Sequence, residues 1–382
     1  MPRRKSVKTW SRDELCDLLS RHGLPLRELL KMAGDLRDQH HGRTVSFSRN
    51  VFVPLTNLCR DYCTYCVFRR DPDEPGGHTM SPDEVLERAN RAVELGCTEA
   101  LFSLGDRPEA VFPDMRRHLA QSGYRSTVQY LAAMCEQVLN ETTLIPHSNP
   151  GLMSPRALTQ LSRSNGSLGL MLENVSDRLM RPGMPHHRAP DKEPRRRLRT
   201  IEDAGRLGIP FTTGILFGIG ETIPELIDSL LAIRKINDQF GHIQEVIIQN
   251  FRAKTGTPMT HHPEPDFDQV KRTAAVARLA LGAEMNIQVP PNLSSSHYSS
   301  LMEAGINDWG GISPLTPDFI NPEAPWPHLT QLKEQTESEG YHLRERLSVY
   351  PEFLERSMKR SPQLAKTLEA LSDADGFRRG GL

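Results

Sequence analysis

Three cysteines stand close together in the first fifth of the chain, at a spacing that suits an inorganic centre. Cys59, Cys63 and Cys66 form the pattern C-x3-C-x2-C at the end of an apolar stretch that begins at Val51. Three thiolates can hold three irons of a [4Fe–4S] cluster and leave the fourth iron for another ligand, whereas an electron-carrying cluster normally takes four cysteines. The triplet therefore predicts chemistry at an open iron.

A structural zinc site is the alternative use of such a triplet. Zinc would need a fourth protein ligand to close its tetrahedron, and His78 in the segment PGGHTM is the nearby candidate. The other cysteines, Cys16, Cys97 and Cys135, are scattered, which is typical of buried free thiols. Six cysteines over 382 residues do not form a disulfide framework.

Composition excludes several classes of protein. With 47 basic and 48 acidic side chains the formal charge is -1, so there is no overall cationic field for nucleic acid or an anionic membrane. No stretch approaches the roughly 18 to 20 apolar residues of a membrane span, and the basic start lacks the apolar core of a secretory signal. We expect a cytoplasmic protein that binds neither nucleic acid nor membrane.

Short strand-like runs alternate with longer helix-like runs from about residue 44, which indicates parallel strands joined by crossover helices. Eight is the strand number of a (β/α)8 barrel, and a doubly wound open sheet is the alternative. The eight expected strands are Val45–Pro54, Glu99–Leu104, Thr143–His147, Ser167–Leu172, Phe211–Phe217, Glu245–Phe251, Asn286–Val289 and Ile306–Trp309.

Helix signals complete the expected α/β architecture. Ser81 and Glu84 form a capping box with Pro82 at the first helical position, and Ser11 with Glu14 forms another. We expect an N-terminal helical extension over 1–43, a TIM-type barrel over 44–330 and a C-terminal helical segment over 331–382. In such a barrel the active-site loops follow the carboxyl ends of the strands, where the cysteine triplet falls.

The triplet resembles the signature of the radical S-adenosylmethionine (SAM) enzymes, in which an aromatic residue precedes the last cysteine. Tyr65 fills that place. The resemblance implies that Cys59, Cys63 and Cys66 bind a [4Fe–4S] cluster and that SAM chelates the open iron. It also implies that one-electron reduction of the cluster releases a 5'-deoxyadenosyl radical. A barrel mouth would seclude that radical from water.

The same resemblance implies where SAM binds. Ser103, Gly105 and Asp106 follow the second strand, where the family receives the amino group of SAM, although the usual glycine pair is Leu-Gly here. Glu173, after the fourth strand, would contact the ribose and amino groups. The alternatives are a simple turn with a solvated Asp106 and a helix N-terminal acid at Glu173.

Two further positions complete the implied SAM site. Arg197 lies eleven residues before Gly208, an offset that resembles the arginine that grips the carboxylate of SAM. Its neighbours Arg195, Arg196 and Arg199 fit a solvated helix face. Gly218, in the stretch GILFGIGE, resembles the adenine-contacting segment of the family. A glycine-rich strand end alone is weak evidence for an adenine contact, and its position after the fifth strand strengthens that evidence.

Four other runs resemble the smaller subunit of the FO synthases: 102–109, 209–222, 248–259 and 304–327. The resemblance implies formation of the deazaflavin FO, 7,8-didemethyl-8-hydroxy-5-deazariboflavin, in coenzyme F(420) biosynthesis. The implied substrate is 5-amino-5-(4-hydroxybenzyl)-6-(D-ribitylimino)-5,6-dihydrouracil. Hydrogen abstraction, cyclisation and loss of ammonia would complete the ring. A companion large subunit would supply the substrate, and ferredoxin or flavodoxin would supply electrons.

Polar residues at the ends of the last three strands are the expected substrate contacts. Gln249, Asn250, Asn292 and Asn307 could bind the uracil edge, phenol or ribityl chain. Asp308 is the expected catalytic proton acceptor, because ring closure must shed protons. A capping Asn or a structurally hydrogen-bonded Asp is the alternative for each of these positions.

Other functions remain open at this level. The chain could be the companion tyrosine-using synthase or a futalosine-pathway radical SAM enzyme, because the barrel hosts many reactions. A non-catalytic Fe–S protein is a more distant alternative.

Overall fold

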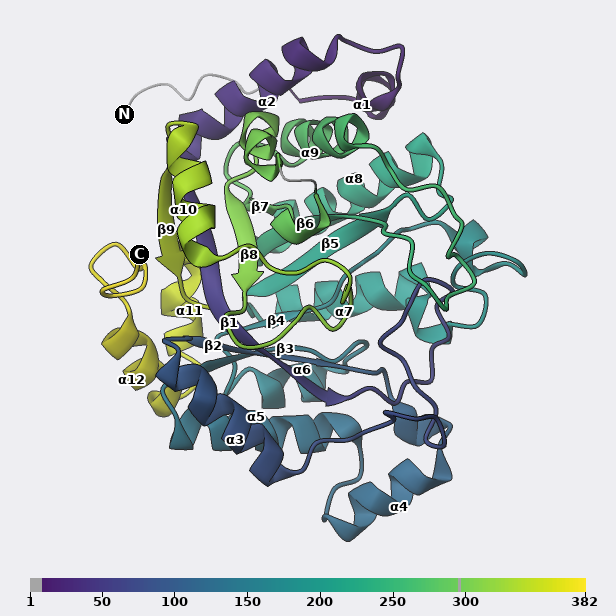
Figure 1. The fold of residues 1–382 in the computed structure, drawn as a ribbon, viewed down its shortest axis with the longest axis vertical. Helices are drawn as coiled ribbons and strands as arrows, with labels where there is room; N and C mark the ends of the chain where they lie inside the picture. Colours follow the sequence, from purple (N-terminus) through teal and green to yellow (C-terminus); the bar gives the residue numbers. More distant parts are fainter. Residues whose placement is uncertain (1–8, 295–296) are drawn as a thin grey trace.

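The computed structural model describes residues 9–294 and 297–382, and over these residues nine parallel strands form one sheet (Figure 1). The strand order is β2-β3-β4-β5-β6-β7-β8-β1-β9, and pairing of β1 with β2 closes the first eight strands into a barrel. The prediction of a (β/α)8 barrel is confirmed. The strands are β1 (Thr44–Thr56), β2 (Glu99–Leu104), β3 (Ile145–Asn149), β4 (Ser167–Gly169), β5 (Phe211–Phe217), β6 (Ile243–Asn250), β7 (Ile287–Gln288), β8 (Asp308–Ile312) and β9 (His342–Arg346).

Strand β1 is long enough to have different partners along one edge. Its carboxyl half pairs with β2, from Asn50 opposite Glu99 onward. Its amino half pairs with β9, from Thr44 opposite His342 to Ser48 opposite Arg346. Strand β9 therefore fills the space beside β1 at the amino-terminal end of the barrel, which we call the floor. The sequence predicts only helices in this segment.

Helices surround the barrel, and the crossover helices lie where the alternating pattern predicts them. Helices α3, α5, α6, α7, α8 and α9 connect successive strands from β1 to β7. Among the described residues, no helix combines the length and apolar character needed to cross a membrane. The helices are α1 (Arg12–Leu19), α2 (Leu26–His41), α3 (Pro82–Glu94), α4 (Pro113–Gln121), α5 (Thr127–Glu141), α6 (Pro155–Leu161), α7 (Pro194–Arg206), α8 (Ile223–Phe240), α9 (Phe267–Leu281), α10 (Leu329–Ser338), α11 (Leu354–Met358) and α12 (Pro362–Leu371).

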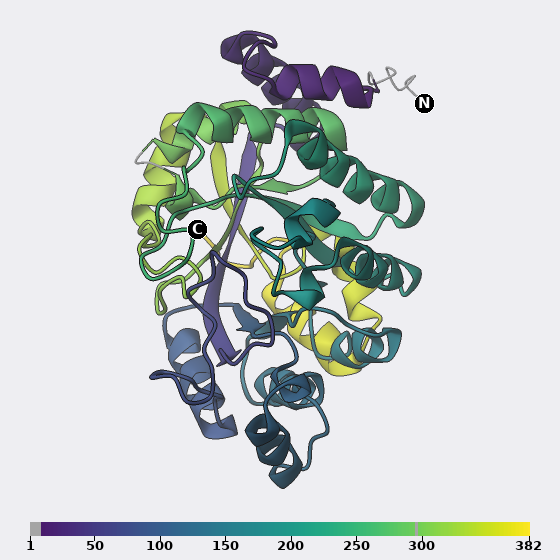
Figure 2. The ribbon, with the colours of Figure 1, turned by 90° about the vertical axis from the view of Figure 1, so that its right-hand side faces the viewer.

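The amino-terminal helices pack outside the ring of barrel helices, as Figure 2 shows for the purple segment. Helix α1 contacts α8 and α9, and α2 contacts α9. The buried guanidinium of Arg37 in α2 donates to the carbonyl of Ile306 (2.8 Å) and to the hydroxyl of Tyr341 (2.6 Å). These bonds fix the extension to the floor of the barrel. Both predicted capping boxes, at Ser11 and Ser81, are present.

Strand β8 differs from its prediction in a way that changes the site. The sequence predicts Ile306–Trp309, but the strand runs from Asp308 to Ile312. Asn307 and Asp308 therefore lie at the floor of the barrel, opposite the end that carries the cysteine loop. The expectation that they lie at the barrel mouth is wrong.

Candidate active site

The cysteine loop leaves the carboxyl end of β1 and is held against the loop that follows β2. The sulfur of Cys59 accepts hydrogen bonds from the backbone amides of Asp106 (3.2 Å) and Asp61 (3.4 Å). The amide of Cys66 donates to the carbonyl of Cys63 (3.1 Å), which turns the chain between the last two cysteines. The three cysteines are thus brought to one face of the barrel.

The electrostatics of these cysteines fit a polynuclear metal centre. Burial raises the pKa of Cys63 to about 12 and that of Cys59 well above its usual value, and the thiolates repel one another. Thiolates here therefore need a cation to offset their charge. Among the described residues, these sulfurs do not all lie within 4.8 Å of one another, a spacing that suits a cluster of several irons better than a single zinc ion. His78 instead pairs with Glu84 (2.9 Å).

Tyr65 helps to cover the cysteines with apolar surface. Its hydroxyl lies 2.9 Å from Nε2 of the buried His186. Burial lowers the pKa of His186 to about 3, so this imidazole is neutral at pH 7. The Tyr65 ring belongs to an apolar cluster with which Cys63 and Cys66 pack. The arrangement limits water at the cysteine loop.

Gly105 permits the close contact between the β2 loop and the cysteine loop. A Cβ atom at this position would lie 2.0 Å from the carbonyl oxygen of Leu58 and 2.7 Å from Cβ of Cys59. The amide of Gly105 donates to the carbonyl of Thr56 (2.8 Å). Ser103 lies two residues earlier, within β2, opposite Pro54 in the β1–β2 register.

Asp106 is a buried carboxylate with spare hydrogen-bonding capacity. Its Oδ2 accepts from the amide of Leu152 (3.3 Å), whereas Oδ1 accepts no hydrogen bond from the described residues and lies 3.5 Å from Nε of Arg107. Oxygens of Asp61 and Asp191 lie within 4.8 Å. Burial, followed by repulsion from Asp191 and Asp61, raises the pKa of Asp106 to about 7. The side chain would therefore gain from a nearby cation.

Glu173 follows β4 and faces the same rim in a strained backbone conformation. Its φ of 65° is unusual for a residue other than glycine. The strain is held by bonds to β5: its amide donates to Gly214 (3.1 Å) and its carbonyl accepts from Leu216 (3.0 Å). Burial opposes its ionisation, but Lys192 and Arg197 outweigh that effect and lower the pKa of Glu173. Glu173 is therefore an ionised, buried carboxylate.

Arg197 lies next to Glu173, as expected, but most of its guanidinium is already engaged. Its Nε donates to the carbonyl of Met171 (2.7 Å) and Nη1 to that of Asp191 (3.0 Å), while Nη2 lies 3.9 Å from Glu173. Lys192 pairs with Glu173 directly. The sequence analysis does not identify Lys192, because a lysine in the turn before α7 carries no spacing signal.

Gly218 directly follows β5 and has a φ of 89°. Its amide and that of Ile219 donate to the carboxylate of Glu221, at 2.7 and 3.0 Å. A Cβ at Gly218 would lie 2.4 Å from Pro265. The glycine therefore fixes the shape of this stretch, and its amide is not free for a ligand.

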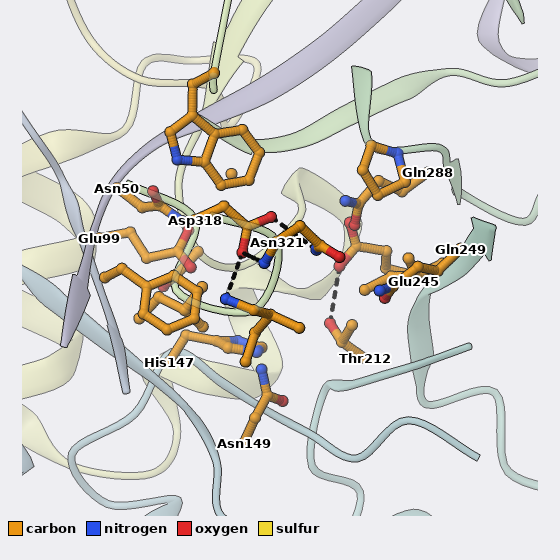
Figure 3. A pocket seen from close by; sticks show the side chains of 18 of the residues that line it. Asn50, Glu99, His147, Asn149, Thr212, Glu245, Gln249, Gln288, Asp318 and Asn321 are labelled. Atoms are coloured by element: carbon orange, nitrogen blue, oxygen red, sulfur yellow. Dashed lines mark hydrogen bonds between the residues drawn. The ribbon is translucent and has the colours of Figure 1, made fainter. Parts of the chain in front are cut away.

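A cavity occupies the barrel interior and is lined by five carboxamides (Figure 3). The predicted residue Gln249 lies on one side together with Gln288, and Asn50 lies across the cavity from them. Asn149 and Asn321 complete the set. Carboxamides each offer donors and an acceptor, so the cavity suits a ligand with amide-like edges.

Two of the other predicted substrate residues support the wall of this cavity. Asn250 donates to the carbonyl of Leu293 (3.2 Å). Asn292 donates to Asp318 (3.0 Å) and to the carbonyl of Ala324 (3.0 Å). Neither side chain lines the cavity. They hold the loops after β7 and β8 in place.

For the remaining two predicted residues, Asn307 and Asp308, the structure does not support contact with a substrate. The Oδ1 atom of Asn307 accepts from Arg278 and from the amide of Ile287, both at 2.9 Å. Asp308 is fully buried in an ion pair with Arg346. Because both lie at the floor and are fully engaged by protein groups, neither is placed to meet a substrate or accept its proton.

The deepest part of the cavity is polar and was not predicted. Glu245 and His147 line it with Arg346 of β9. Burial raises the pKa of Glu245 to about 7 and lowers that of His147 to about 4. Periodicity alone does not distinguish their inward direction, and Arg346 belongs to a strand in a segment for which the sequence predicts only helices.

Residues 53–233 match the radical SAM superfamily. Two solved structures share the fold: the FeFe-hydrogenase maturase HydG from Carboxydothermus hydrogenoformans and methylornithine synthase. The first has a TM-score of 0.72 and 18% identity, covering 95% of this chain and 87% of that chain. The second has a TM-score of 0.69 and 19% identity, covering 88% and 94%. Fold and site thus define a protein of the radical SAM barrel class.

Similar sequences identify the family within the radical SAM class to which the chain belongs. The 7,8-didemethyl-8-hydroxy-5-deazariboflavin synthase of Methanopyrus kandleri is 48% identical over 335 residues, which cover 88% of this chain and 100% of that protein. The chain belongs to the family of that synthase. The FO synthase of Nocardia farcinica is 48% identical over 94% of this chain, and that of Mycobacterium tuberculosis H37Rv is 46% identical over 96%. This chain spans only 43% and 45% of those two longer proteins.

Proposed function

We propose that this chain is a radical SAM enzyme that forms the deazaflavin FO from 5-amino-5-(4-hydroxybenzyl)-6-(D-ribitylimino)-5,6-dihydrouracil, with loss of ammonia. The carrying observation is the position of the cysteine loop beside the buried carboxylate of Asp106, whose Oδ1 atom accepts no hydrogen bond from the described residues. The identity to the Methanopyrus kandleri synthase over its whole length supports the choice of substrate.

Cys59, Cys63 and Cys66 would hold a [4Fe–4S] cluster, because buried thiolates at this spacing need a polynuclear cation. When bound and reduced, that cluster would cleave SAM and supply a 5'-deoxyadenosyl radical for hydrogen abstraction from the substrate. The apolar cluster around Tyr65 would limit access of water to that chemistry.

Charged residues on the rim would orient SAM. Asp106 would accept a hydrogen bond from the ammonium group, which would also relieve its repulsion from Asp61 and Asp191. Glu173 would contact the ribose hydroxyls. The Nη2 atom of Arg197, which donates none of the hydrogen bonds that hold Nε and Nη1, would meet the carboxylate.

Three small residues or stretches would shape the rest of the SAM site. Ser103 at the end of β2 and Gly105 just after it would let the backbone approach the ligand, because Gly105 already brings that loop against Leu58. The stretch around Gly218 would lie against the adenine. Gln249 would contact the substrate below SAM, inside the barrel.

The proposed reaction requires other proteins. A companion radical SAM synthase would make the substrate, and the part of the longer FO synthases that this chain does not span is the corresponding source in those proteins. A low-potential donor such as ferredoxin or flavodoxin would reduce the cluster in the cytoplasm.

An anaerobic turnover assay tests the proposal. The cluster-loaded protein receives SAM, dithionite and the benzylated uracil substrate, and we expect fluorescent deazaflavin, methionine and 5'-deoxyadenosine. Cys63→Ala should abolish all three products. Cys16→Ala is the matched control, because Cys16 lies on helix α1 outside the barrel.

Other substrates separate this function from its neighbours. Product from tyrosine and a ribityl-diaminouracil alone would favour the companion synthase, and product from a futalosine-type precursor would favour that pathway. A reducible cluster with no 5'-deoxyadenosine would contradict enzyme activity altogether.

A further inference from the structure

The loop that follows β8, residues 313–327, forms one wall of the barrel cavity and is held together by Asp318. Its Oδ1 atom accepts from the amides of Ile320 (2.9 Å) and Asn321 (3.1 Å). Its Oδ2 atom accepts from the side-chain amides of Asn321 (2.9 Å) and Asn292 (3.0 Å). Four hydrogen bonds to one carboxylate fix this loop, which we call the Asp318 loop.

The Asp318 contact fixes the orientation of Asn321. An ionised carboxylate accepts hydrogen bonds and does not donate them, so Nδ2 of Asn321 must face Asp318. Oδ1 of Asn321 is therefore left as an acceptor. The residue is 4% exposed and lines the cavity, and Oδ1 has no partner among the described residues. Figure 3 shows Asn321 reaching from Asp318 into the cavity.

Trp326 presents the complementary group from the same loop. Trp326 lines the same cavity, and its buried Nε1 atom lacks a hydrogen-bond partner among the described residues. An indole N–H can only donate. A buried polar group that stays unpaired is unfavourable, so two such groups on one loop indicate a polar ligand.

We propose that Asn321 and Trp326 recognise the imide edge of the pyrimidinedione ring of the substrate. Oδ1 of Asn321 accepts from the ring N3–H, and Nε1 of Trp326 donates to an adjacent ring carbonyl. One fixed acceptor and one fixed donor match the N–H and C=O of an imide. The inference rests on the proposed function, because that function supplies the pyrimidinedione substrate.

Binding of a ring probe and its methylated analogue tests the contact without turnover. The cluster-loaded protein with SAM, but without reductant, is titrated calorimetrically under anaerobic conditions with 5-amino-6-(D-ribitylamino)uracil and with its N3-methyl analogue. The wild type should bind the methylated ring at least about tenfold more weakly, because Oδ1 of Asn321 loses its donor and meets a methyl group. Equal binding of the two ligands would overturn the proposal.

Two variants give different signatures. Asn321→Ala should weaken the parent ring about tenfold and bind both rings within about twofold of each other. Trp326→Phe should weaken both rings by about the same factor and keep the preference for the unmethylated ring, because both rings retain their carbonyls. Wild-type preference in Asn321→Ala, or wild-type affinity in Trp326→Phe, would overturn the corresponding contact.

Matched controls separate recognition from disturbance of the loop. Asn292→Ala removes a hydrogen bond to the same Asp318 oxygen but no group that lines the cavity, so it should keep the N3-methyl preference. Trp10→Phe removes an indole N–H outside the barrel and should leave both affinities unchanged. Loss of the preference in Asn292→Ala would attribute the effect to loop structure and overturn the proposal.

The experiments distinguish failure of the proposed function from failure of the proposed imide contact. Absence of deazaflavin from the wild type in the turnover assay counts against the proposed function. Deazaflavin formation together with unchanged N3-methyl discrimination in Asn321→Ala counts against the imide contact alone.

Discussion

Arg346 of β9 and Asp308 of β8 form a two-point ion pair beneath the cavity. Nε of Arg346 lies 2.7 Å from Oδ2 of Asp308, and Nη2 lies 3.0 Å from Oδ1. The same Nη2 donates to Glu245 at 3.1 Å. One guanidinium thus compensates two buried carboxylates from different strands.

Removal of that guanidinium should destabilise the barrel strongly. Arg346→Met leaves Asp308 and Glu245 buried without a cation, and we expect the free energy of unfolding to fall by about 3–5 kcal/mol. Arg344→Met is the matched control on the same strand, because its pairs with Asp373 and Asp375 are partly exposed to solvent and should contribute at most about 1 kcal/mol. Urea unfolding measures both changes, and equal losses would contradict a special role for the floor pair.

Substitution of Asn307 should lower the stability of the protein, whereas substitution of Gln249 should weaken ligand binding. Asn307→Leu removes the acceptor for Arg278 and for the amide of Ile287, so it should lower the free energy of unfolding by about 1–3 kcal/mol. Gln249→Leu should keep stability but weaken binding of the ribityl-aminouracil probe about tenfold. A stable Asn307→Leu protein with weakened probe binding would restore the sequence-based assignment.

Gly105→Ala should prevent assembly of the proposed [4Fe–4S] cluster. The added Cβ would overlap the Leu58 carbonyl and crowd Cys59, so the cysteine loop must move. We expect a large loss of iron and sulfide after anaerobic reconstitution. Gly123→Ala is the control, because its φ of 82° imposes strain of about 1 kcal/mol while no atom lies within 4 Å of the added Cβ. Wild-type iron content in Gly105→Ala would show that the close contact is dispensable.

Asp106 should make stability depend on pH. Its pKa is raised by burial to about 7 from 3.8, so the folded chain keeps this proton to a higher pH than the unfolded chain. That contribution to stability is complete below about pH 4 and is lost as the pH rises through about 7. The stability of Asp106→Asn relative to the wild type should therefore increase between about pH 5 and pH 8. Urea unfolding of the cluster-free protein measures it, and a constant difference would contradict the shift.

The sequence was sufficient for most strands and for the position of the cysteine loop. Strands β2 and β5 are apolar runs with clear ends, and their predicted bounds agree with the structure. The position of the triplet after β1 followed from chain order alone. Periodicity and end signals carry this information because barrel strands are buried on both faces.

Strand β8 was misplaced because its side chains are unusual for a strand. Gly310 and Gly311 give no β-propensity signal. Glycine is required at both positions because there is no space for a side chain. A Cβ at Gly310 would lie 2.0 Å from Nε2 of Gln288, and one at Gly311 would lie 2.0 Å from Nδ2 of Asn50. The glycines make room for the carboxamides of the cavity, and that long-range contact is invisible in a local pattern.

Strand β9 is not predicted because its charged sequence resembles a solvent-exposed segment. Its sequence HLRER is charged, and charge normally indicates a solvated face. Glu345 and Arg346 are buried because each finds an ion-pair partner contributed by another segment, and pairing of that kind cannot be read from local sequence. The Asp318 loop could not be predicted as a binding segment either. The atoms Oδ1 of Asn321 and Nε1 of Trp326 lack hydrogen-bond partners only because of how distant segments pack around them.

The position of β9 has a consequence for the order of events at the ribosome. Synthesis of β1 to β8 is complete by Ile312, but the partner of the amino half of β1 emerges only after His342. A nascent chain arrested between these points would contain all eight barrel strands while Asp308 and Glu245 lacked Arg346. Co-translational folding should therefore stall in an open-floored intermediate, and protease resistance of the barrel should appear only once β9 has left the exit tunnel.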